Sequence, residues 1–351
     1  MKIINVVGAR PQFIKAAMVS RAIRPYCQEI LIHTGQHYDE NMSKVFFDEL
    51  GLPIPDIYLG IGSDSHARQT GRMMSGIEDI LLGERPDWVT VYGDTNSTLA
   101  GALSAAKLYI PVAHIEAGLR AYRKTMPEEI NRVLVDHMSS ALFCPAQQAV
   151  NNLAKEGITE GVYLVGDVMA DALQYFIQFA TTRSTILTDL DLVPGNYALA
   201  TIHRAANTDD PKRLASILDA LGDIDFPVVF PAHPRTQQVI ESQRIPLNHN
   251  IRMVLPVSYL TMLQLEANAD CILTDSGGVQ KEAYWLGVRC ITLREETEWI
   301  ETVSYDWNRL VGIDRTAILD AVHNWRPAGE RPDIYGDGHA ADKIKELLLN
   351  F

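Results

Sequence analysis

The sequence predicts an α/β fold made of two doubly wound domains, each with a parallel β-sheet covered by helices on both faces. Apolar, β-rich runs without polar alternation recur along the chain, and helical segments follow several of them. This pattern is typical of strands buried on both faces of a parallel sheet. The alternation pauses after about residue 166 and begins again at about residue 197. The length of 351 residues fits two domains or one large one.

The expected strands form two series. The first series is KIINVV, EILIHT, DWVTVY, PVAHIE, ALFCP and GVYLVG. A helix, VMADALQYFIQFA, and a polar stretch then join the two series near residues 167–195. The second series is YALATI, PVVFPA, IRMVLP, CILTD, RCITL and NRLVG. A last helix, GHAADKIKELLLNF, follows a segment rich in Pro and Gly and could pack on either domain.

The composition excludes several kinds of partner. A formal net charge of −13 leaves no basic field to follow a nucleic-acid backbone or an anionic membrane surface. Cys27, Cys144, Cys271 and Cys290 are scattered, which predicts reduced thiols rather than a zinc site. No apolar run approaches the roughly 18 residues of a membrane span, and the first strand is too short for a secretory signal. We therefore expect a cytoplasmic protein without a membrane segment or bound metal.

Charged or polar side chains that could bind a ligand or transfer a proton follow nearly every expected strand. Ligands of open parallel sheets bind beyond the carboxyl ends of the strands, so this series suggests two carboxyl edges that face one cleft. In the first domain the residues are Arg10, Gln36, His37, Asp94 and Glu116. In the second domain they are His203, Arg204, His233, Arg235, Asp275, Ser276, Arg294 and Glu295.

The stretch DSGGVQKEA indicates an anion site in the second domain. A strand ends there, a Ser-Gly-Gly turn follows, and a helix begins with bare backbone N–H groups. The turn consists of Ser276, Gly277 and Gly278, and Glu282 lies one helical turn further on, where it can bind a ribose diol. His203 and Arg204, at a strand end, suit a diphosphate.

The stretch GARPQFIK also indicates an anion. Arg10 and Lys15 lie in the first turns of a helix, where cations oppose the helix dipole unless an anion sits between them. The G-x-G-x-x-G pattern is missing, so we expect no bound dinucleotide.

Acidic residues gather in the first domain. On the helix that Pro127 can begin, Glu128 and Arg132 are four residues apart and so share a face. Beside Asp94 and Glu116, Glu128 is a candidate third carboxylate. Carboxylates that converge near a phosphate leaving group suit proton abstraction and donation.

The remaining candidates are interpreted as structural. We assign His114 and Cys144 to cores, and we expect no metal at His33 and His37 because a glycine separates them.

A set of motifs carries a resemblance to a known family. GARPQFIKA, YGDTNSTLAG, HIEAGLR, MPEEINR, HRAANTDD, PAHPRT, LTDSGGVQKEA, TEWIETV and YGDGHAA occur in this order. The chain resembles the non-hydrolysing UDP-N-acetylglucosamine 2-epimerases over essentially its full length. The resemblance implies two Rossmann-like domains of the glycosyltransferase-B type, an active site in the cleft between them, and a homodimer. It places the C-terminal helix, about 338–351, back on the first domain at 1–168, with the second domain at 169–337.

The resemblance also implies the reaction and its residues. The family interconverts UDP-N-acetylglucosamine and UDP-N-acetylmannosamine without a cofactor. UDP is eliminated to leave 2-acetamidoglucal, and it adds again after C2 takes a proton on the other face. By similarity, the catalytic positions are Asp94, Glu116, Glu128 and His203. The UDP-binding positions are Arg10, Lys15, Ser276, Gly277, Gly278 and Glu282, and we add Arg132, Arg204 and His233 as substrate-binding candidates.

The chain departs from the family pattern in two places. It reads HRAAN, with Ala206 where members often carry Glu. It also carries Tyr38 and Asp39 in a segment that differs from the form typical of members activated by UDP-N-acetylglucosamine at a second site, so we expect no such allosteric site.

Several functions stay open on these residues. The departing segment and TEWIETV look like the subgroup that acts on UDP-2,3-diacetamido-2,3-dideoxyglucuronic acid in the O-antigen synthesis of lipopolysaccharide. The substrate therefore stays open between the two sugars. The alternatives are a UDP-sugar-dependent glycosyltransferase of the same fold, a hydrolysing epimerase, and a nucleotide-sugar-binding protein without turnover.

Overall fold

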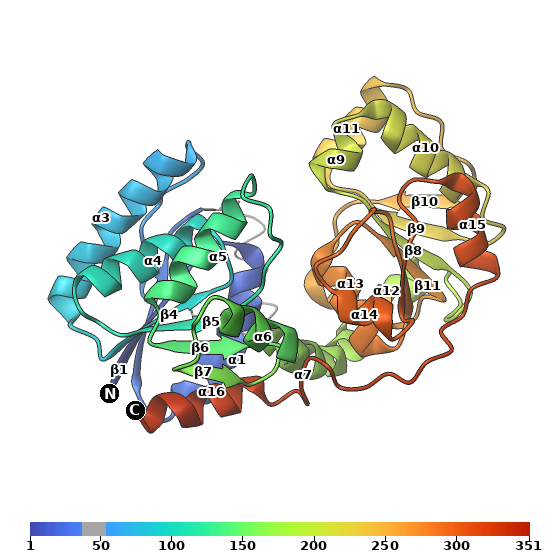
Figure 1. Ribbon diagram of the computed structural model, residues 1–351. Coiled ribbons are helices and arrows are strands. Elements are labelled where there is room, and N and C mark those ends of the chain that lie inside the picture. The colour runs from blue at the N-terminus through green and yellow to red at the C-terminus, as the bar shows by residue number, and fades with distance from the viewer. Residues whose placement is uncertain (37–53) are drawn as a thin grey trace. The chain divides into compact units, whose positions relative to one another are not determined.

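The computed structural model describes residues 1–36 and 54–351, and these divide into two compact units (Figure 1). Unit 1 comprises Met1–Gln174 and Asp333–Phe351, and unit 2 comprises Tyr175–Pro332. Within the described ranges every strand pairing is parallel. Helices cover both faces of each sheet (Figure 1). The predicted class, two doubly wound α/β domains, is confirmed.

Unit 1 is built around a sheet whose strand order is β3-β2-β1-β4-β5-β6-β7. Its strands are β1 (Lys2–Val7), β2 (Gln28–His33), β3 (Ile57–Tyr58), β4 (Trp88–Tyr92), β5 (Val112–Ile115), β6 (Ala141–Cys144) and β7 (Val162–Leu164). Its helices are α1 (Arg10–Ile23), α3 (His66–Glu84), α4 (Asn96–Lys107), α5 (Pro127–Met138), α6 (Gln147–Lys155) and α16 (Ala340–Leu349). The sequence pattern did not predict β3, because two residues are too few to produce a periodic signal.

The centre of unit 1 is a packed apolar core. All five residues of β4 are buried, as expected for a strand covered on both faces. Helix α3 adds a stripe of Met73, Ile77 and Leu81, which repeat every four residues on one face. Burial of each such side chain contributes about 1.5–3 kcal/mol. The core therefore holds the ends of β4 and β5 in place, and the candidate site begins at those ends.

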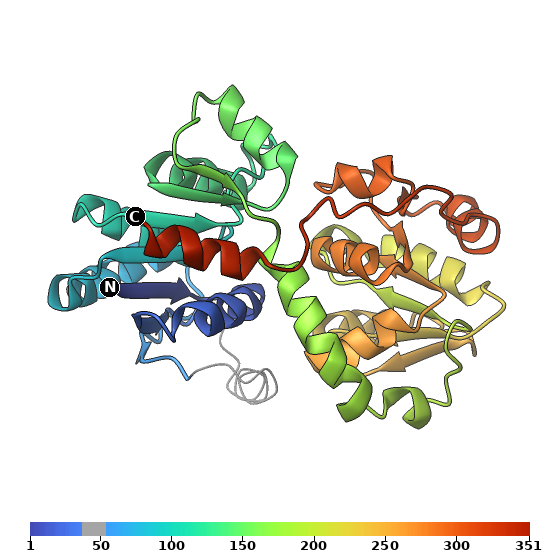
Figure 2. The ribbon, with the colours of Figure 1, turned by 90° about the horizontal axis from the view of Figure 1, so that it is seen from below.

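The last helix belongs to unit 1. Helix α16 packs beside α1 (Figure 2). Its first turn is held by Asp171, whose carboxylate accepts the backbone N–H groups of Ala340 (3.0 Å) and Ala341 (2.7 Å). This pairing places a negative charge at a helix N-terminus, where it is favourable. The C-terminal helix thus returns to the first unit, as the resemblance implied.

Unit 2 repeats the same architecture with a sheet of order β10-β9-β8-β11-β12-β13. Its strands are β8 (Ala198–Thr201), β9 (Val228–Pro231), β10 (Ile251–Val254), β11 (Cys271–Thr274), β12 (Arg289–Thr292) and β13 (Asn308–Leu310). Its helices are α8 (Ile186–Asp189), α9 (Ala205–Thr208), α10 (Pro211–Gly222), α11 (Pro234–Ser242), α12 (Tyr259–Ala267), α13 (Gly277–Leu286), α14 (Ile300–Ser304) and α15 (Arg315–His323). Helix α7 (Val168–Arg183) begins in unit 1 and ends in unit 2.

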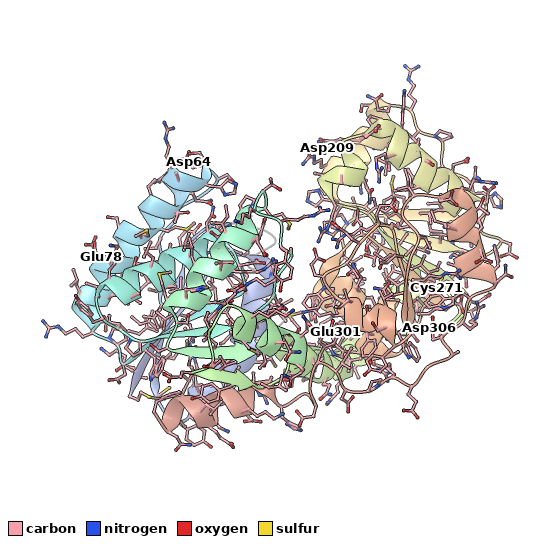
Figure 3. The ribbon with its side chains drawn as sticks, in the orientation of Figure 1. Asp64, Glu78, Asp209, Cys271, Glu301 and Asp306 are labelled. Atoms are coloured by element: carbon pink, nitrogen blue, oxygen red, sulfur yellow. The ribbon has the colours of Figure 1, made fainter. Side chains whose placement is uncertain are left out.

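The four cysteines are free thiols. Cys144, Cys271 and Cys290 are buried in strands, and Cys271 is labelled in unit 2 in Figure 3, whereas Cys27 is only half-buried. Burial raises the pKa of the Cys271 thiol to about 12. Among the helices of the described ranges, none combines the length and the apolar character needed to cross a membrane.

Each sheet has one point where the strand order reverses. β1 lies next to β4 in unit 1, and β8 lies next to β11 in unit 2. Loops that leave such a pair diverge, and open α/β sheets bind their ligands there. The register pairs Tyr92 with Ile115 in unit 1 and Thr201 with Thr274 in unit 2. The loops that carry Asp94 and Glu116 therefore begin at the same level of one sheet.

Candidate active site

The turn between β1 and α1 is occupied by side chains of this protein. A Cβ atom at Gly8 would overlap the hydroxyl groups of Ser97 and Thr34, so only glycine fits there. The Gln12 side-chain oxygen accepts hydrogen bonds from the N–H groups of Gly8 (2.8 Å) and Ala9 (3.0 Å). These two donors are therefore already used, whereas a dinucleotide-binding turn offers them to a pyrophosphate. The sequence analysis did not single out Gln12; its signal was the third helical position, from which a Gln can reach back to the helix start.

Lys15, on the second turn of α1, forms an ion pair with Glu116, the residue that follows β5. The two side chains are 7% and 13% exposed. A Cβ atom at Gly93 would lie 3.1 Å from Oε2 of Glu116, so that glycine makes room for the carboxylate. The sequence analysis expected an anion beside Lys15, and in this structure Lys15 holds a carboxylate of its own chain.

The backbone at Glu116 is strained. Its φ is +70°, a left-handed conformation that residues other than glycine seldom adopt. Such strain gathers at functional sites, where the surrounding structure holds it in place. Two hydrogen bonds do so here, because the N–H groups of Glu116 and Ala117 both donate to the carbonyl of Phe143 at 3.1 Å.

Arg132 of α5 binds two acidic side chains. Its Nε and Nη2 donate to Oδ2 of Asp94 at 2.9 and 2.6 Å, and its Nη1 donates to Glu129 at 3.0 Å. Burial and the charge of Glu116 raise the pKa of Asp94, and the charge of Arg132 only partly offsets them. The structure thus brings Asp94 and Glu116 together, each with a cation of its own.

The pairing of Arg132 with Glu128, which the spacing suggested, is wrong. Glu129 is buried and takes that place, while Glu128 is exposed at the start of α5. The carboxylate of Glu129 also accepts the N–H groups of Ala121 and Tyr122, both at 2.8 Å, and so fixes the loop after β5. The helical spacing was correct, but only the packing decides which of two adjacent glutamates faces inward.

A fully buried polar network lies under the two carboxylates. The ring of His114, in β5, bonds Asp136 of α5 through Nδ1 and the carbonyl of Gly93 through Nε2, both at 2.7 Å. Asp136 also accepts from Arg120 (2.6 Å) and from the N–H of Gly118 (3.1 Å). Burial works to raise the pKa of Asp136, but His114 and Arg120 outweigh it and lower that pKa. His114 does belong to a core, as expected, but to a polar one.

In unit 2 a buried carboxylate organises the loop after β8. Asp275 accepts hydrogen bonds from the N–H groups of His203 (3.1 Å) and Arg204 (3.1 Å) and from the side chain of Asn207 (3.1 Å). The ring Nδ1 of His203 lies 3.2 Å from Asp275, and the His203 side chain is 52% exposed. Burial works to raise the pKa of Asp275, and the hydrogen bonds and charge of His203 lower it overall. Ala206 lies exposed on α9, directly after this loop.

Helix α13 begins at the Ser-Gly-Gly turn, as the sequence predicted. Ser276 is the N-cap, and its side chain accepts from the N–H of Val279. Gly278 is exposed, and a Cβ atom there would meet only the Ser276 hydroxyl, at 3.9 Å. Glu282 is buried in the second turn of α13. Burial, and then the charge of Glu282, raise the pKa of the fully buried Glu266 of α12 far above its ordinary value.

Arg294 and Arg235, two further cations that the sequence places at strand ends of unit 2, have acidic neighbours. Arg294 donates two hydrogen bonds of 3.0 Å to Glu298, which also lies 3.8 Å from Arg204. His233 is exposed and caps α11 by accepting from the N–H of Arg235. Arg235 forms an exposed ion pair of 2.6 Å with Asp209, labelled in Figure 3.

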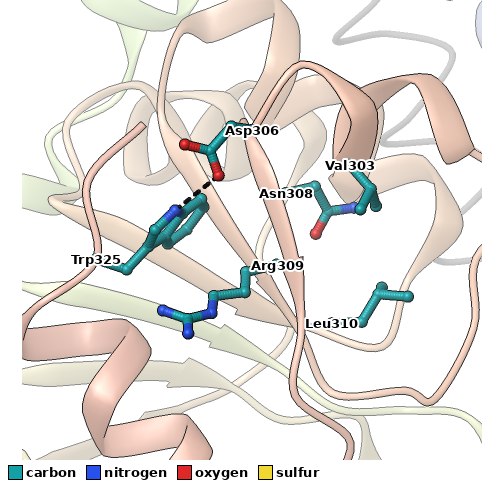
Figure 4. Close-up of a pocket in the computed structure, with 6 residues that line it drawn as sticks. All are labelled: Val303, Asp306, Asn308, Arg309, Leu310 and Trp325. Carbon is teal, nitrogen blue, oxygen red and sulfur yellow. Dashed lines mark hydrogen bonds between the residues drawn. The ribbon is translucent and has the colours of Figure 1, made fainter. Parts of the chain in front are cut away.

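Two surface hollows lie elsewhere. One, of about 500 Å³, lies beside the edge strand β13, where the carboxylate of Asp306 accepts from the indole of Trp325 (Figure 4). The other, of about 670 Å³, includes Met1 and Phe351 in its lining. Neither is lined by a residue that the sequence analysis assigned to the site. In the part of the chain that the structure describes, no group of three His, Cys, Asp or Glu side chains could hold a metal ion.

Some expectations fall outside the described residues. His37, Tyr38 and Asp39, and with them the expectation about an allosteric site, lie in the segment 37–53. Arg10 begins α1, and its backbone alone is described.

Comparison with known proteins places the chain in a family. The family model described as UDP-N-acetylglucosamine 2-epimerase matches residues 21–349. The chain belongs to this family. A family relative from Methanococcus maripaludis, a UDP-N-acetylglucosamine 2-epimerase homolog, is 51% identical over an alignment of 356 residues that covers 100% of each chain. The UDP-2,3-diacetamido-2,3-dideoxy-D-glucuronate 2-epimerase of Pseudomonas aeruginosa is 48% identical over 358 residues, covering 99% of each chain.

A solved structure of the family has the same fold. The crystal structure of the Methanocaldococcus jannaschii UDP-N-acetylglucosamine 2-epimerase, in complex with UDP-N-acetylglucosamine and UDP, superimposes with a TM-score of 0.90. The two chains are 43% identical, and the match covers 100% of each. The family resemblance inferred from the motifs is thus confirmed.

Proposed function

We propose that this protein is a non-hydrolysing UDP-sugar 2-epimerase, an isomerase that inverts C2 of the sugar by eliminating UDP and adding it back. The observation that carries the proposal is the pair Asp94 and Glu116, two carboxylates at neighbouring strand ends, each bound to its own cation. A glycosyltransferase needs only one such base. A pair with different surroundings suits the removal of a proton from one face and its return to the other.

The two carboxylates differ in a way that suggests their roles. Burial and the charge of Glu116 raise the pKa of Asp94 toward the range of a proton donor, and we infer that role for Asp94. The ion pair with Lys15 stabilises the charge on Glu116, so we infer that Glu116 is the acceptor. Glu128, exposed at the start of α5, is the third carboxylate that the family resemblance implies.

The leaving group carries much of the barrier. The C2–H bond is not acidic, so the C1–O bond must break before or together with deprotonation. We assign the diphosphate to the exposed His203, to the half-buried Arg204 and to the N–H groups at the start of α13 in unit 2. A preorganised donor of this kind lowers the activation free energy by about 2.7–4 kcal/mol. Glu282, buried in α13, is assigned to the ribose.

Proton NMR in deuterated water tests the proposal. The full-length protein is incubated with UDP-N-acetylglucosamine alone, and the sugar is followed at C1 and C2. We expect the C2 epimer, with deuterium at C2, in the absence of any acceptor. A product that keeps protium at C2 would overturn the mechanism. Turnover only with an acceptor would indicate a glycosyltransferase, release of free sugar would indicate a hydrolysing epimerase, and binding without turnover a nucleotide-sugar-binding protein.

A second substrate is favoured by one observation. The Pseudomonas aeruginosa relative, at 48% identity over 99% of both chains, is named for UDP-2,3-diacetamido-2,3-dideoxy-D-glucuronate. The same assay with that sugar, compared through kcat/KM, decides between the two substrates. A higher value for the diacetamido sugar assigns the protein to that subgroup.

We also propose that the enzyme is a cytoplasmic homodimer. The family resemblance supports the dimer, and the free state of all four cysteines is consistent with a reducing compartment. Light scattering after size-exclusion chromatography tests the dimer, and a monomer in the active fraction would contradict it.

A further inference from the structure

The hydrogen-bond partners of His114 determine its charge. The carbonyl oxygen of Gly93, 2.7 Å from Nε2, can only accept, so Nε2 carries a proton. Asp136, 2.7 Å from Nδ1, accepts two further hydrogen bonds, from Arg120 and from the N–H of Gly118. A carboxylate that accepts from an arginine and a backbone N–H in this way is ionised. Nδ1 therefore also carries a proton, and the ring is an imidazolium ion.

This cation has no contact with solvent. The side chains of His114 and Asp136 are both 0% exposed, and that of Arg120 is 1% exposed. Arg120 also binds Glu156 through two hydrogen bonds of 2.7 and 2.8 Å. The network contains two cations and two carboxylates, so its charges balance, and a buried charge is stable only when paired in this way.

The position of the ring connects it to the candidate carboxylates. Gly93 directly precedes Asp94. The carbonyl of Gly93 is bonded to His114, and the N–H of Gly93 donates to the carbonyl of Ile115 at 2.9 Å. Ile115 directly precedes Glu116. The peptide before Asp94 is therefore fixed on both sides by β5, the strand that ends at Glu116.

We propose that His114 is a permanently charged positioning residue, which locks the Gly93 turn and thereby sets the separation of Asp94 and Glu116. The proposal rests on the proposed function, because it assigns the two carboxylates to the proton transfers. The Gly93 turn lies under Glu116: a Cβ atom at Gly93 would be 3.1 Å from Oε2 of Glu116 and 3.9 Å from Nζ of Lys15. If the hydrogen bond from His114 to the Gly93 carbonyl is lost, the turn can move and displace the Glu116 carboxylate.

The charge of His114 can be tested in the unmodified protein. Full-length enzyme with 15N-labelled histidine is examined by NMR at a mildly alkaline pH, above the ordinary histidine pKa of about 6.5. His114→Gln identifies the signals by their loss. We expect both ring nitrogens of His114 to show directly bonded protons. A single protonated nitrogen at His114 overturns the inference.

The positioning role is tested by kinetics. In His114→Gln the neutral amide can still donate one hydrogen bond, and Asp136 keeps Arg120 and Gly118, so the fold is retained. We expect kcat to fall about 10- to 100-fold, as for a small misplacement of reacting groups, with KM and UDP affinity close to wild type. His249→Gln, an exposed change in unit 2, is the control and keeps full activity.

The outcomes separate the two proposals. A His114→Gln enzyme with wild-type kcat contradicts the positioning role, and so does a loss that appears only in KM. If the wild-type protein shows no exchange at C2 with either sugar, the proposed function fails instead, and the 15N result still decides the charge of the ring.

Discussion

The carboxyl edges of the two sheets use their charged residues differently. In unit 1 the candidate side chains bind one another: Lys15 pairs with Glu116, and Arg132 pairs with Asp94. In unit 2 the candidate groups are more open. His203 is 52% exposed, and the helix start at Gly278 is exposed.

The difference indicates two tasks. Groups that hold each other through buried ion pairs keep a fixed geometry, which proton transfer requires. Exposed cations and free N–H groups at a helix start are suited to receive an anion. We therefore expect changes in unit 1 to affect the chemical step and changes in unit 2 to affect UDP binding, and the following predictions test that division.

The largest effect is expected from Glu116→Gln. Loss of a general acid or base lowers kcat about 10²- to 10⁴-fold, and exchange of the C2 proton should fall equally. UDP affinity, measured by calorimetry, should stay close to wild type, because the diphosphate groups are assigned to unit 2. Glu78→Gln, an exposed change on α3 (Figure 3), is the control. If Glu116→Gln abolishes UDP binding, the division between the units is wrong.

Arg132→Met should destabilise unit 1. The change removes hydrogen bonds to the carboxylates of Asp94 and Glu129, one partly and one almost fully buried. A hydrogen bond to a charged group contributes about 1.5–3 kcal/mol, and the partial exposure of Asp94 places the loss at the lower end of that range. Urea unfolding measures it. An unchanged unfolding free energy would show that the ion pair adds nothing to stability.

The decrease in the free energy of unfolding at acidic pH should depend on Asp136. Its pKa is lowered in the folded protein, so it binds fewer protons there than in the unfolded chain. Its contribution is present above the ordinary aspartate value of about 3.9 and is lost as the pH falls through the lowered value. Urea unfolding at a series of acidic pH values should give a shallower decline for Asp136→Asn than for wild type. The exposed change Asp79→Asn should leave the slope unchanged.

The smallest effect on stability is expected from Gly278→Ala. This variant should nevertheless bind UDP more weakly than its control. The added methyl group fits the free protein, and a helical Gly→Ala change stabilises by about 0.4–1 kcal/mol. The same methyl group lies where a diphosphate must approach the backbone, so UDP affinity should fall. Gly71→Ala, in α3 with open space around it, should stabilise equally without changing UDP binding. Equal UDP affinity in both variants would contradict the assignment of the diphosphate to the start of α13.

Some of the site could be predicted from the sequence because its signals are local. The strand ends at Asp94, Glu116 and Asp275 follow from apolar runs that stop, and the start of α13 follows from Ser-Gly-Gly. The roles of His114 and Asp136 could not be predicted, because their partners lie 16 to 22 residues away along the chain. A histidine in an apolar context carries no signal of the group that it will bond.

By itself, the sequence determined the two-domain α/β class, most of the strands along the chain and the family, since each depends on periodicity or on contiguous motifs. Only the tertiary structure decided which glutamate of the 128–129 pair faces inward, that Lys15 binds Glu116, and that His114 lies between Asp136 and the carbonyl of Gly93. These choices depend on which buried charges meet across separate strands and helices. A buried charge is tolerated only where a partner of opposite sign or a complete set of hydrogen bonds reaches it, and that condition is set by the packed fold.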